Sequence, residues 1–131
     1  MGDRAAWTKY AGGEVLKAPR SKYGARPEVV DGYRFDSRRE AARYRELRIL
    51  ERLGVIRDLE LQPRYPIVVR ELKDVALWIT CGHYTADFRY LETETGAVAV
   101  EDVKSKATRT TAYRLRKRLV EAIYGIRILE V

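Results

Sequence analysis

The sequence predicts an α/β domain with a mixed β-sheet, and two observations support this fold class. Hydrophobic residues make up 46% of the 131 residues, which is enough to fill the core of one compact domain. The periodicity of apolar residues then changes along the chain in the order helix, strands, helix, strand. This order is typical of a sheet covered by helices.

Residues 1–26 are expected to form a flexible basic arm, and residues 27–131 the folded domain. Glycines and prolines interrupt any periodicity in the arm, where basic residues outnumber acidic ones. Such an arm either lies on the phosphates of a nucleic acid or has no fixed structure.

The folded part is expected to open with a short extended piece and a helix. Residues 29–35 surround the turn-forming pair Asp31-Gly32, and the helix should run from Asp36 or Ser37 to about Leu53, with Gly54 as its stop signal. Basic residues share one side of this helix: Arg38, Arg45, Arg48 and Arg52. Apolar residues share another side: Ala42, Ile49 and Leu53.

Strand formers dominate the middle of the chain. Residues 55–70 and 75–79 read as extended, and two prolines restrict the first of these segments to an edge or a bulge. Residues 84–91 alternate, with one face formed by Tyr84, Ala86, Phe88 and Tyr90. Residues 97–104 begin apolar on both faces, as a central strand does, and a short turn over residues 93–96 joins the two strands.

A second helix and a last strand complete the expected domain. The helix should cover residues 110–124 and end at Gly125, and the strand should cover residues 126–131. The stripe expected to be buried consists of Ala112, Leu115, Leu119, Ala122 and Ile123.

The hairpin register places two acidic residues opposite each other. If the turn contains four residues, Glu92 pairs with Ala97 and Asp87 comes opposite Asp102, with Lys104 two residues further along the same face. Like charges in this position destabilise a sheet unless a cation lies between them. A bound Mg²⁺ would use two carboxylates together with water and phosphate oxygens, which is the arrangement that phosphodiester hydrolysis needs.

Simpler readings of these residues stay open. Asp102 and Lys104 could merely pair with each other at the end of a strand. Glu101 is the second choice for the site, although alternation turns it to the opposite face. Glu40 has the spacing of a capping-box partner for Ser37, and it also lies on the side of the helix that faces the protein.

The charge of the chain favours a polyanionic partner. The net charge is +7 and the isoelectric point about 9.7, which indicates nucleic acid binding or a solvated basic surface. Basic residues that could bind phosphates gather around the second helix: Lys106, Arg109, Arg114, Lys117 and Arg118. Packing in the core is the preferred role for Tyr113, ahead of stacking on a base.

Other classes of protein are disfavoured. No apolar run is long enough to span a membrane, and the start of the chain does not resemble a signal peptide. The single cysteine, Cys81, favours a reducing cytosol, and His83 is the only histidine, so a zinc site is not expected. The absence of asparagine and the single glutamine indicate a thermostable protein.

With Glu40, Asp87 and residues 102–104 in place, the chain resembles the PD-(D/E)xK nuclease superfamily. That pattern has an acid on the first helix, an Asp at one strand and an acid-x-Lys on the next. The chain more closely resembles a family of small phage proteins described as Holliday junction resolvase-like endonucleases. The matching stretches are residues 32–41, 61–63, 84–88 and 100–105. Ala86 stands where the superfamily name has Pro.

The resemblance implies a restriction-endonuclease-like fold with an α-β-β-β-α-β core, and a homodimer that cuts branched DNA such as a four-way junction. It implies Mg²⁺ as the cofactor, or Mn²⁺ in its place, held by three acids and a backbone carbonyl: Glu40, Asp87, Asp102 and Val103. It implies that Lys104 positions the attacking water, and that Gln62 holds the substrate or the site. Arg38 joins the expected DNA contacts.

Two alternatives to a resolvase remain open at this point. An enzyme with the same fold could act on a nicked, flapped or transposition-type substrate. A DNA-binding module without catalysis would explain the basic charge, although it would not explain three acids and a lysine in this order.

Overall fold

The computed structural model of the protein describes residues 26–131, so the expected basic arm lies outside the described residues except for Arg26. In chain order the elements are β1 (Glu28–Val30), β2 (Tyr33–Phe35), α1 (Arg38–Arg52), β3 (Ile56–Leu61), β4 (Arg64–Arg70), β5 (Trp78–Thr85), β6 (Phe88–Glu92), β7 (Val98–Asp102), the 3₁₀ turn η3 (Lys106–Thr108), α2 (Thr111–Tyr124) and β8 (Ile128–Glu130). None of the helices within residues 26–131 is long and apolar enough to cross a membrane.

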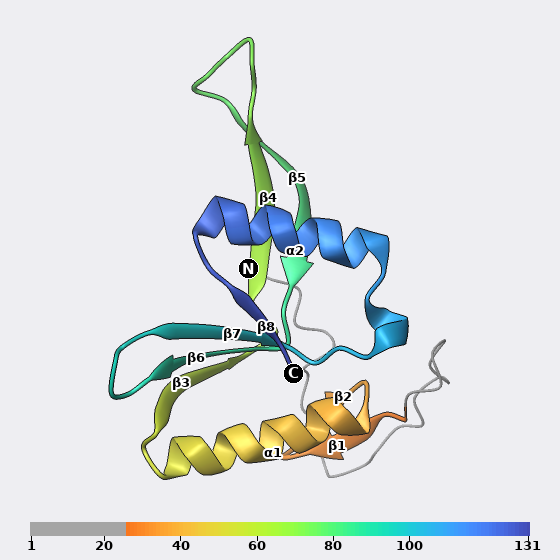
Figure 1. Cartoon of the computed structure of the whole chain (residues 1–131), viewed down its shortest axis with the longest axis vertical. Coiled ribbons are helices and arrows are strands. Elements are labelled where there is room, and N and C mark those ends of the chain that lie inside the picture. The colour runs from red at the N-terminus through yellow and green to blue at the C-terminus, as the bar shows by residue number, and fades with distance from the viewer. Residues whose placement is uncertain (1–25) are drawn as a thin grey trace.

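A four-stranded mixed sheet forms the centre of the fold, with the strand order β3-β6-β7-β8 (Figure 1). The strands β3, β6 and β7 run antiparallel, whereas β8 runs parallel to β7. The strand β7 lies between two strands and is buried from Ala99 to Asp102, whereas Val98 at its start is 46% exposed. The predicted α/β class with a mixed sheet is confirmed.

The strands β4 and β5 form a separate two-stranded ribbon that projects away from the central sheet (Figure 1). A register shift between Ile67 and Val68 marks a bulge, and Pro66 lies in β4, which pairs on one side only. The expected restriction of the proline-containing segment to an edge or bulge is therefore confirmed. The strand expected over residues 75–79 is placed too early, because β5 begins at Trp78 and residues 71–77 form the connecting loop.

The continuous strand expected over residues 84–91 is wrong. The chain leaves the ribbon after Thr85 and enters the central sheet at Phe88. At this corner the hydrogen-bond partner changes, because the amide of Ala86 donates to the carbonyl of Pro63, whereas the amide of Asp87 donates to that of Glu101. The four residues predicted to share one face are all buried: Tyr84, Ala86, Phe88 and Tyr90. The corner divides them, because Tyr84 and Ala86 belong to the cluster under α2, whereas Phe88 and Tyr90 belong to the cluster under α1.

Helix α1 begins and ends where the sequence predicts, but it buries a different side. Ser37 caps it by accepting a hydrogen bond from the amide of Glu40, and Leu53 closes its C-terminus. The buried residues are Ala41, Tyr44 and Leu47. The predicted apolar side is exposed: Ala42, Ile49 and Leu53. The aromatic ring of Tyr44 packs against Phe35 at 4.9 Å between centroids. This contact favours burial of the helix side that carries Tyr44.

Helix α2 also exposes the stripe that was expected to be buried. Thr110 caps it, and Gly125 ends it in a left-handed conformation with a φ of 63°. The buried residues are Tyr113 and Val120, so the core role expected for Tyr113 is confirmed. The exposed stripe consists of Ala112, Leu115, Leu119, Ala122 and Ile123. The helix crosses the ribbon β4–β5 (Figure 1). Its buried residues Tyr113 and Val120 face the core there, which leaves the stripe on the outer side of the helix.

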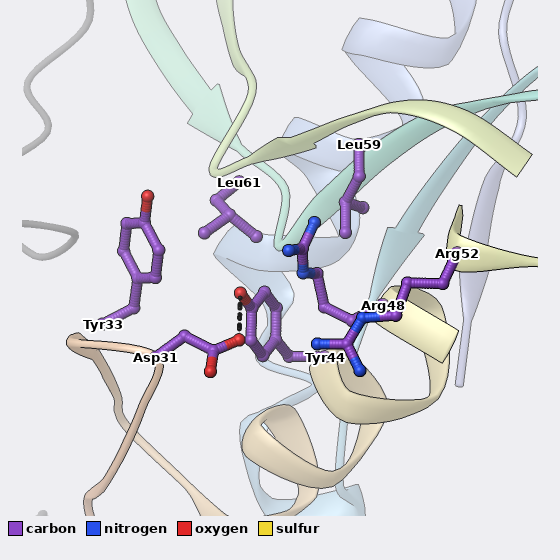
Figure 2. Close-up of a pocket in the computed structure, with 7 residues that line it drawn as sticks. All are labelled: Asp31, Tyr33, Tyr44, Arg48, Arg52, Leu59 and Leu61. Atoms are coloured by element: carbon purple, nitrogen blue, oxygen red, sulfur yellow. Dashed lines mark hydrogen bonds between the residues drawn. The ribbon is translucent and has the colours of Figure 1, made fainter. Parts of the chain in front are cut away.

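Two hydrophobic clusters cover the two faces of the central sheet. One lies under α1 and contains Phe35, Tyr44, Leu47, Phe88 and Tyr90 among its buried residues. The other lies under α2 and contains Ile67, Tyr84, Val100, Val120 and Ile128 among its buried residues. A pocket of about 270 Å³ opens beside the first cluster, between the β1–β2 turn, α1 and β3 (Figure 2).

A buried ion pair fastens α1 to the sheet. The guanidinium of Arg43 donates two hydrogen bonds to the carboxylate of Glu101, at 2.9 Å from Nε and 2.5 Å from Nη2. The hydroxyl of Tyr90 donates a third hydrogen bond to Glu101 at 2.9 Å. Glu101 is only 1% exposed, so its charge depends on these partners.

Arg43→Met should destabilise the fold, because it leaves the carboxylate of Glu101 buried without its cation. The expected loss in the free energy of unfolding is about 2–3 kcal/mol, below the full cost for a buried pair because the guanidinium is partly exposed. Urea denaturation would measure it. Arg45→Met is the matched control, since Arg45 pairs with Glu28 at the surface, and equal losses in the two variants would contradict the assignment.

Candidate active site

The two predicted carboxylates lie side by side where β6 begins and β7 ends. Phe88 pairs with Glu101, and the amide of Asp87 donates to the carbonyl of Glu101 at 3.0 Å. Asp87 therefore comes opposite Asp102, at the end of β7. The predicted register and its four-residue turn are confirmed.

Asp87 is held by its neighbours on three sides. The amide of Val103 donates to its Oδ2 at 2.7 Å, and burial together with the neighbouring carboxyl group of Asp102 raises its pKa. The amide of Gln62, which has a left-handed φ of 49°, donates to the carbonyl of Asp87 at 3.0 Å. The predicted site residue Gln62 thus contacts the site through its backbone.

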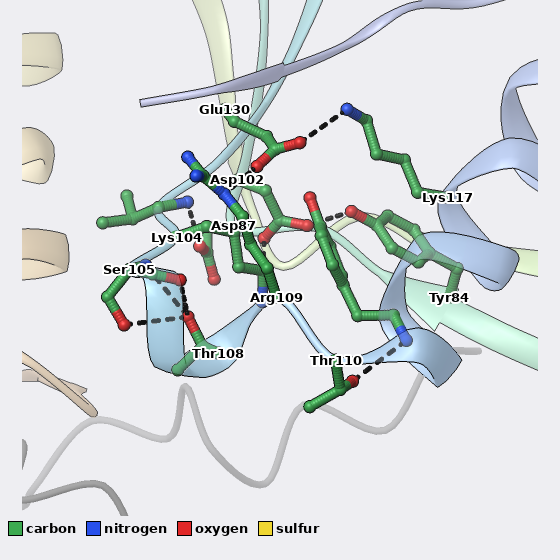
Figure 3. A network of polar contacts seen from close by, with 12 residues as sticks. Tyr84, Asp87, Asp102, Lys104, Ser105, Thr108, Arg109, Thr110, Lys117 and Glu130 are labelled. Carbon is green, nitrogen blue, oxygen red and sulfur yellow. Dashed lines mark hydrogen bonds and ion pairs between the residues drawn. The ribbon is translucent and has the colours of Figure 1, made fainter.

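Asp102 is 1% exposed and is positioned by aromatic and basic side chains (Figure 3). The hydroxyl of Tyr84 donates to its Oδ2, while its Oδ1 is buried and has no hydrogen-bond partner. Lys104 lies 3.9 Å from Oδ1 through its Nζ, and the same ammonium lies 4.5 Å from the centre of the Tyr113 ring. Asp102 and Lys104 therefore do pair, as the simpler reading expected, but they do so inside a larger cluster.

Glu40 serves as a cap and also faces the acidic pair. Its amide donates to the hydroxyl of Ser37 at 3.1 Å, and its carboxylate accepts from the amide of Asp36 at 3.2 Å. Besides burial, the charge of Glu40 also raises the pKa of Asp87. The capping role is confirmed in part, because the carboxylate reaches back to the amide of Asp36 instead of that of Ser37, while the metal-site role stays a prediction.

Burial makes ionisation of all three acids unfavourable. Desolvation and the nearby Asp36 raise the pKa of Glu40 to about 7. Desolvation, with the charges of Glu40 and Asp102, raises the pKa of Asp87 well above its usual range. Desolvation also raises the pKa of Asp102, although Lys104 and the Tyr84 hydroxyl oppose this shift. The cluster is therefore short of positive charge.

Glu101, the second choice for the site, belongs to the other face of the sheet. Its carboxylate is fully engaged with Arg43 and Tyr90 under α1. The alternation along β7 thus separates a structural carboxylate, Glu101, from the candidate site residue, Asp102.

The basic residues predicted to bind DNA divide into two groups. Arg109 and Lys117 contact Glu130, at 2.5 Å and 2.9 Å, and Glu130 pairs with Asp102 across β7 and β8 (Figure 3). The hydrogen bond from Lys117 lowers the pKa of Glu130. The remaining predicted residues have exposed side chains at the surface: Arg38, Lys106, Arg114 and Arg118. They are therefore not part of the buried cluster.

Four residues of the site were missed by the sequence reasoning. Tyr84 and Tyr113 enter it from β5 and α2, with ring centroids 6.2 Å apart, and Glu130 enters from β8. Arg39 donates to the carbonyl of Lys104 at 3.2 Å and to that of Val131 at 3.3 Å, which ties α1 to the two strand ends. Arg39 and Tyr84 carried a signal, because they stand in two of the stretches that matched the nuclease pattern, residues 32–41 and 84–88.

The cluster fits a divalent cation in its chemistry, although not as a complete cage. Within residues 26–131, no group of three or more His, Cys, Asp or Glu side chains is close enough to hold a metal ion by itself. Mg²⁺ does not need such a group, because it commonly binds one or two carboxylates and keeps several waters or phosphate oxygens. The unpartnered Oδ1 of Asp102 and the raised pKa of Asp87 both favour an added cation.

The arrangement can perform one kind of chemistry without further side chains. Two adjacent carboxylates provide oxygen ligands, and Lys104 provides a cation on the same side. Tyr84 and the amide of Val103 keep the carboxylates in place. Such a set can hold a hard cation against a phosphate group and place a water molecule beside it.

Comparison with known proteins gives one match. The family described as "Protein of unknown function (DUF1064)" matches residues 20–128 of the chain. No curated protein matches the chain, and no solved structure matches it.

In the absence of divalent cations, the protein should lose stability as the pH rises from about 4 to about 7. The acids titrate near pH 4 in the unfolded chain, whereas the pKa of folded Glu40 is about 7 and that of Asp87 is also raised. The folded state holds more protons in this window, so the free energy of unfolding falls as they are lost.

Thermal denaturation in EDTA would measure this effect. Asp87→Asn should melt at a higher temperature than wild type at pH 7.5 and close to wild type at pH 4.5, while Asp58→Asn, an exposed position that also has a left-handed φ, should change neither value. A lower melting temperature for Asp87→Asn at pH 7.5 would contradict the assigned repulsion.

Proposed function

The chain belongs to the DUF1064 family, and from its carboxylate–lysine cluster we propose that it is a metal-dependent DNA endonuclease with a restriction-endonuclease-like fold. One observation carries the proposal: the hairpin register brings Asp87 against Asp102, with Lys104 on the same side. Because like charges in this position destabilise a sheet, a purely structural role would not favour the pair.

The order of elements supports the proposed fold. Helix α1 is followed by the meander β3-β6-β7, by α2 and by the parallel strand β8, which is the α-β-β-β-α-β order that the resemblance implies. The ribbon β4–β5 is an insertion between the first two strands of that meander. It leaves the candidate site intact, because Gln62 and Asp87 at its two ends are hydrogen-bonded to each other.

Mg²⁺ is the proposed cofactor, and Mn²⁺ could replace it. Asp87 and Asp102 would hold it, with Glu40 and the backbone carbonyl of Val103 as further ligands. When bound, it would polarise the phosphate and lower the pKa of a water molecule. Tyr84 keeps the carboxylate of Asp102 oriented through its hydrogen bond.

Lys104 is proposed to position the attacking water. Hydrolysis requires this water to approach phosphorus in line with the leaving oxygen, and a fixed ammonium can hold the water or stabilise the charge that develops on the phosphate. The ring of Tyr113 under Nζ and the ion pair with Asp102 restrict where the ammonium can lie. The flexible side chain is therefore ordered before substrate binds.

Six of the predicted basic residues, together with Gln62, are proposed to bind the phosphates of DNA. They are Arg38, Gln62, Lys106, Arg109, Arg114, Lys117 and Arg118. Contacts of this kind give affinity without reading the sequence, which suits recognition of DNA shape. A four-way junction or another branched DNA is the proposed substrate. Flap, nicked and transposition-type substrates are the alternatives within the same fold.

The wild-type protein is expected to nick a labelled four-way junction when Mg²⁺ is present. It should leave a matched linear duplex intact. Asp87→Asn and Asp102→Asn should each lower the cleavage rate by more than about a hundredfold, because each removes a charged ligand, while binding to the junction is kept. Gel electrophoresis of the products and fluorescence anisotropy would measure the two properties.

Asp58→Asn is the matched control and should cleave like wild type. Cleavage of the duplex as well as the junction would keep the nuclease and remove the preference for branched DNA. Binding without cleavage of junction, flap or nicked DNA would favour a non-catalytic DNA-binding module. Wild-type cleavage by either site variant would overturn the proposed centre.

We infer that the protein acts as a homodimer through the exposed stripe of α2. Three large apolar residues project from it, Leu115, Leu119 and Ile123, with exposed fractions of 60%, 37% and 37%. A second copy related by a two-fold axis would present the same stripe, so both stripes would be covered at once. A dimer would also provide two sites for the two opposed strands of a junction.

Leu119→Glu should convert the dimer to a monomer, because it places a charge in the centre of the apolar stripe. Size-exclusion chromatography with light scattering would measure the mass of each variant. Leu53→Glu, an exposed apolar position on α1, is the control and should leave the mass unchanged. A wild-type monomer at all concentrations would overturn the inferred dimer.

A further inference from the structure

The pocket between the β1–β2 turn, α1 and β3 has no role in the chemistry described above (Figure 2). Its lining comes from three separate segments: Asp31, Tyr33, Tyr44, Arg48, Arg52, Leu59 and Leu61. Its volume of about 270 Å³ lies just below the lower end of the usual range for ligand pockets, about 300 Å³, which suits a single planar ring system.

The polar groups of the pocket are held in place before any ligand arrives. Arg48 pairs with Glu51, whose other carboxylate oxygen accepts from the amide of Leu59 at 3.2 Å. Asp31 accepts from the hydroxyl of Tyr44 at 2.9 Å and has a left-handed φ of 52° in the turn. The pocket therefore presents ordered groups rather than mobile surface side chains.

Hydrogen-bonding capacity is left over on both sides of the pocket. The guanidinium of Arg48 has five N–H donors, of which only those of Nη1 have a partner within residues 26–131, Glu51, and its Nε is buried without a hydrogen-bond partner there. A carboxylate can accept several hydrogen bonds, so Asp31 can still accept from a ligand besides Tyr44. Leu59, Leu61 and the ring of Tyr33 supply apolar and aromatic walls.

The balance of charge favours a neutral ring over a phosphate. The carboxylate of Asp31 shares the pocket lining with Arg48 and Arg52, and Arg48 is already paired with Glu51, so a phosphate would meet a carboxylate there. A ligand that both accepts from an arginine and donates to a carboxylate fits better. Among the bases, guanine has O6 and N7 as acceptors, and N–H groups on its pairing edge as donors.

The pocket adjoins the candidate active site along one side of α1. Glu40, Tyr44 and Arg48 are spaced by four residues and so share a helix face. The rise of the helix places Arg48 about 12 Å from Glu40 along the axis. On the other wall, Leu61 pairs with Phe88, the residue that follows Asp87. A strand cut at the site could reach the pocket within a few nucleotides.

We propose that this pocket binds one unpaired guanine base of the DNA substrate, a few nucleotides from the cut. The base lies against Tyr33, with Arg48 donating to its acceptor edge and Asp31 accepting from its N–H groups. Bases that are not paired are free to be recognised in this way, and they are found in a flap or where a base next to a branch point is turned out of the stack. The inference rests on the proposed action on DNA and adds a preferred base to it.

Binding of labelled thymidine nonamers in EDTA tests the pocket without any cleavage. The central position carries guanine, adenine or an abasic site, and fluorescence anisotropy gives the dissociation constant. The wild-type chain should bind the guanine nonamer about tenfold more tightly than the abasic one. Arg48→Gln should abolish this preference, whereas Arg45→Gln removes the same charge from the same helix and should keep it.

Asp31→Asn is the second variant. It should not strain the backbone of the turn, because asparagine adopts the left-handed conformation readily. Its amide replaces one acceptor with a donor, so the preference for guanine over adenine should be lost. Circular dichroism would verify that both variants fold.

Equal wild-type affinity for all three nonamers, or no binding to any of them, would overturn the pocket. So would a guanine preference that survives both Arg48→Gln and Asp31→Asn. Mg²⁺-dependent cleavage of the junction tests the proposed nuclease separately. Cleavage without a base preference would overturn guanine binding in the pocket and leave the proposed nuclease in place. Base preference without cleavage would support the pocket and overturn the nuclease.

Discussion

The contact between Asp87 and Asp102 is the constraint on which the rest of the site depends. Two carboxyls meet across a strand pair, with burial raising the pKa of both. In water each would ionise and be hydrated. The fold removes this hydration and places the two groups side by side, which costs free energy. Partial compensation comes from the amide of Val103, the hydroxyl of Tyr84 and the ammonium of Lys104. A cation would complete it.

The strand β7 keeps this unfavourable group separate from the part of the fold that provides stability. Alternate side chains point to opposite faces, so Glu101 meets Arg43 under α1 while Asp102 faces the candidate site. The first acid is matched by a bidentate cation, whereas the second has an oxygen without a hydrogen-bond partner. The same strand therefore carries one satisfied and one unsatisfied carboxylate, and the unsatisfied one marks the place where a ligand is expected.

Two other features of the surface also point to partners. The apolar stripe of α2 is exposed although it has the composition of a buried face. The pocket beside α1 contains a buried nitrogen of Arg48 that has no hydrogen-bond partner. An apolar surface would cover the stripe, whereas a polar ring would bind in the pocket. The two features therefore suit different partners. Neither overlaps with the acids that are proposed to cut DNA.

The sequence by itself determined the class of the fold, the helix caps and the pairing of Asp87 with Asp102. These follow from local rules, because capping, alternation and turn length depend on residues only a few positions apart. Tertiary structure alone decided which side of each helix is buried and where the strand predicted over residues 84–91 is interrupted. It also decided that Tyr113 and Glu130 join the site. Those outcomes depend on the crossing of α2 over the ribbon and on the parallel pairing of β7 with β8. Such long-range contacts select among faces of similar hydrophobicity, and local periodicity does not distinguish these faces.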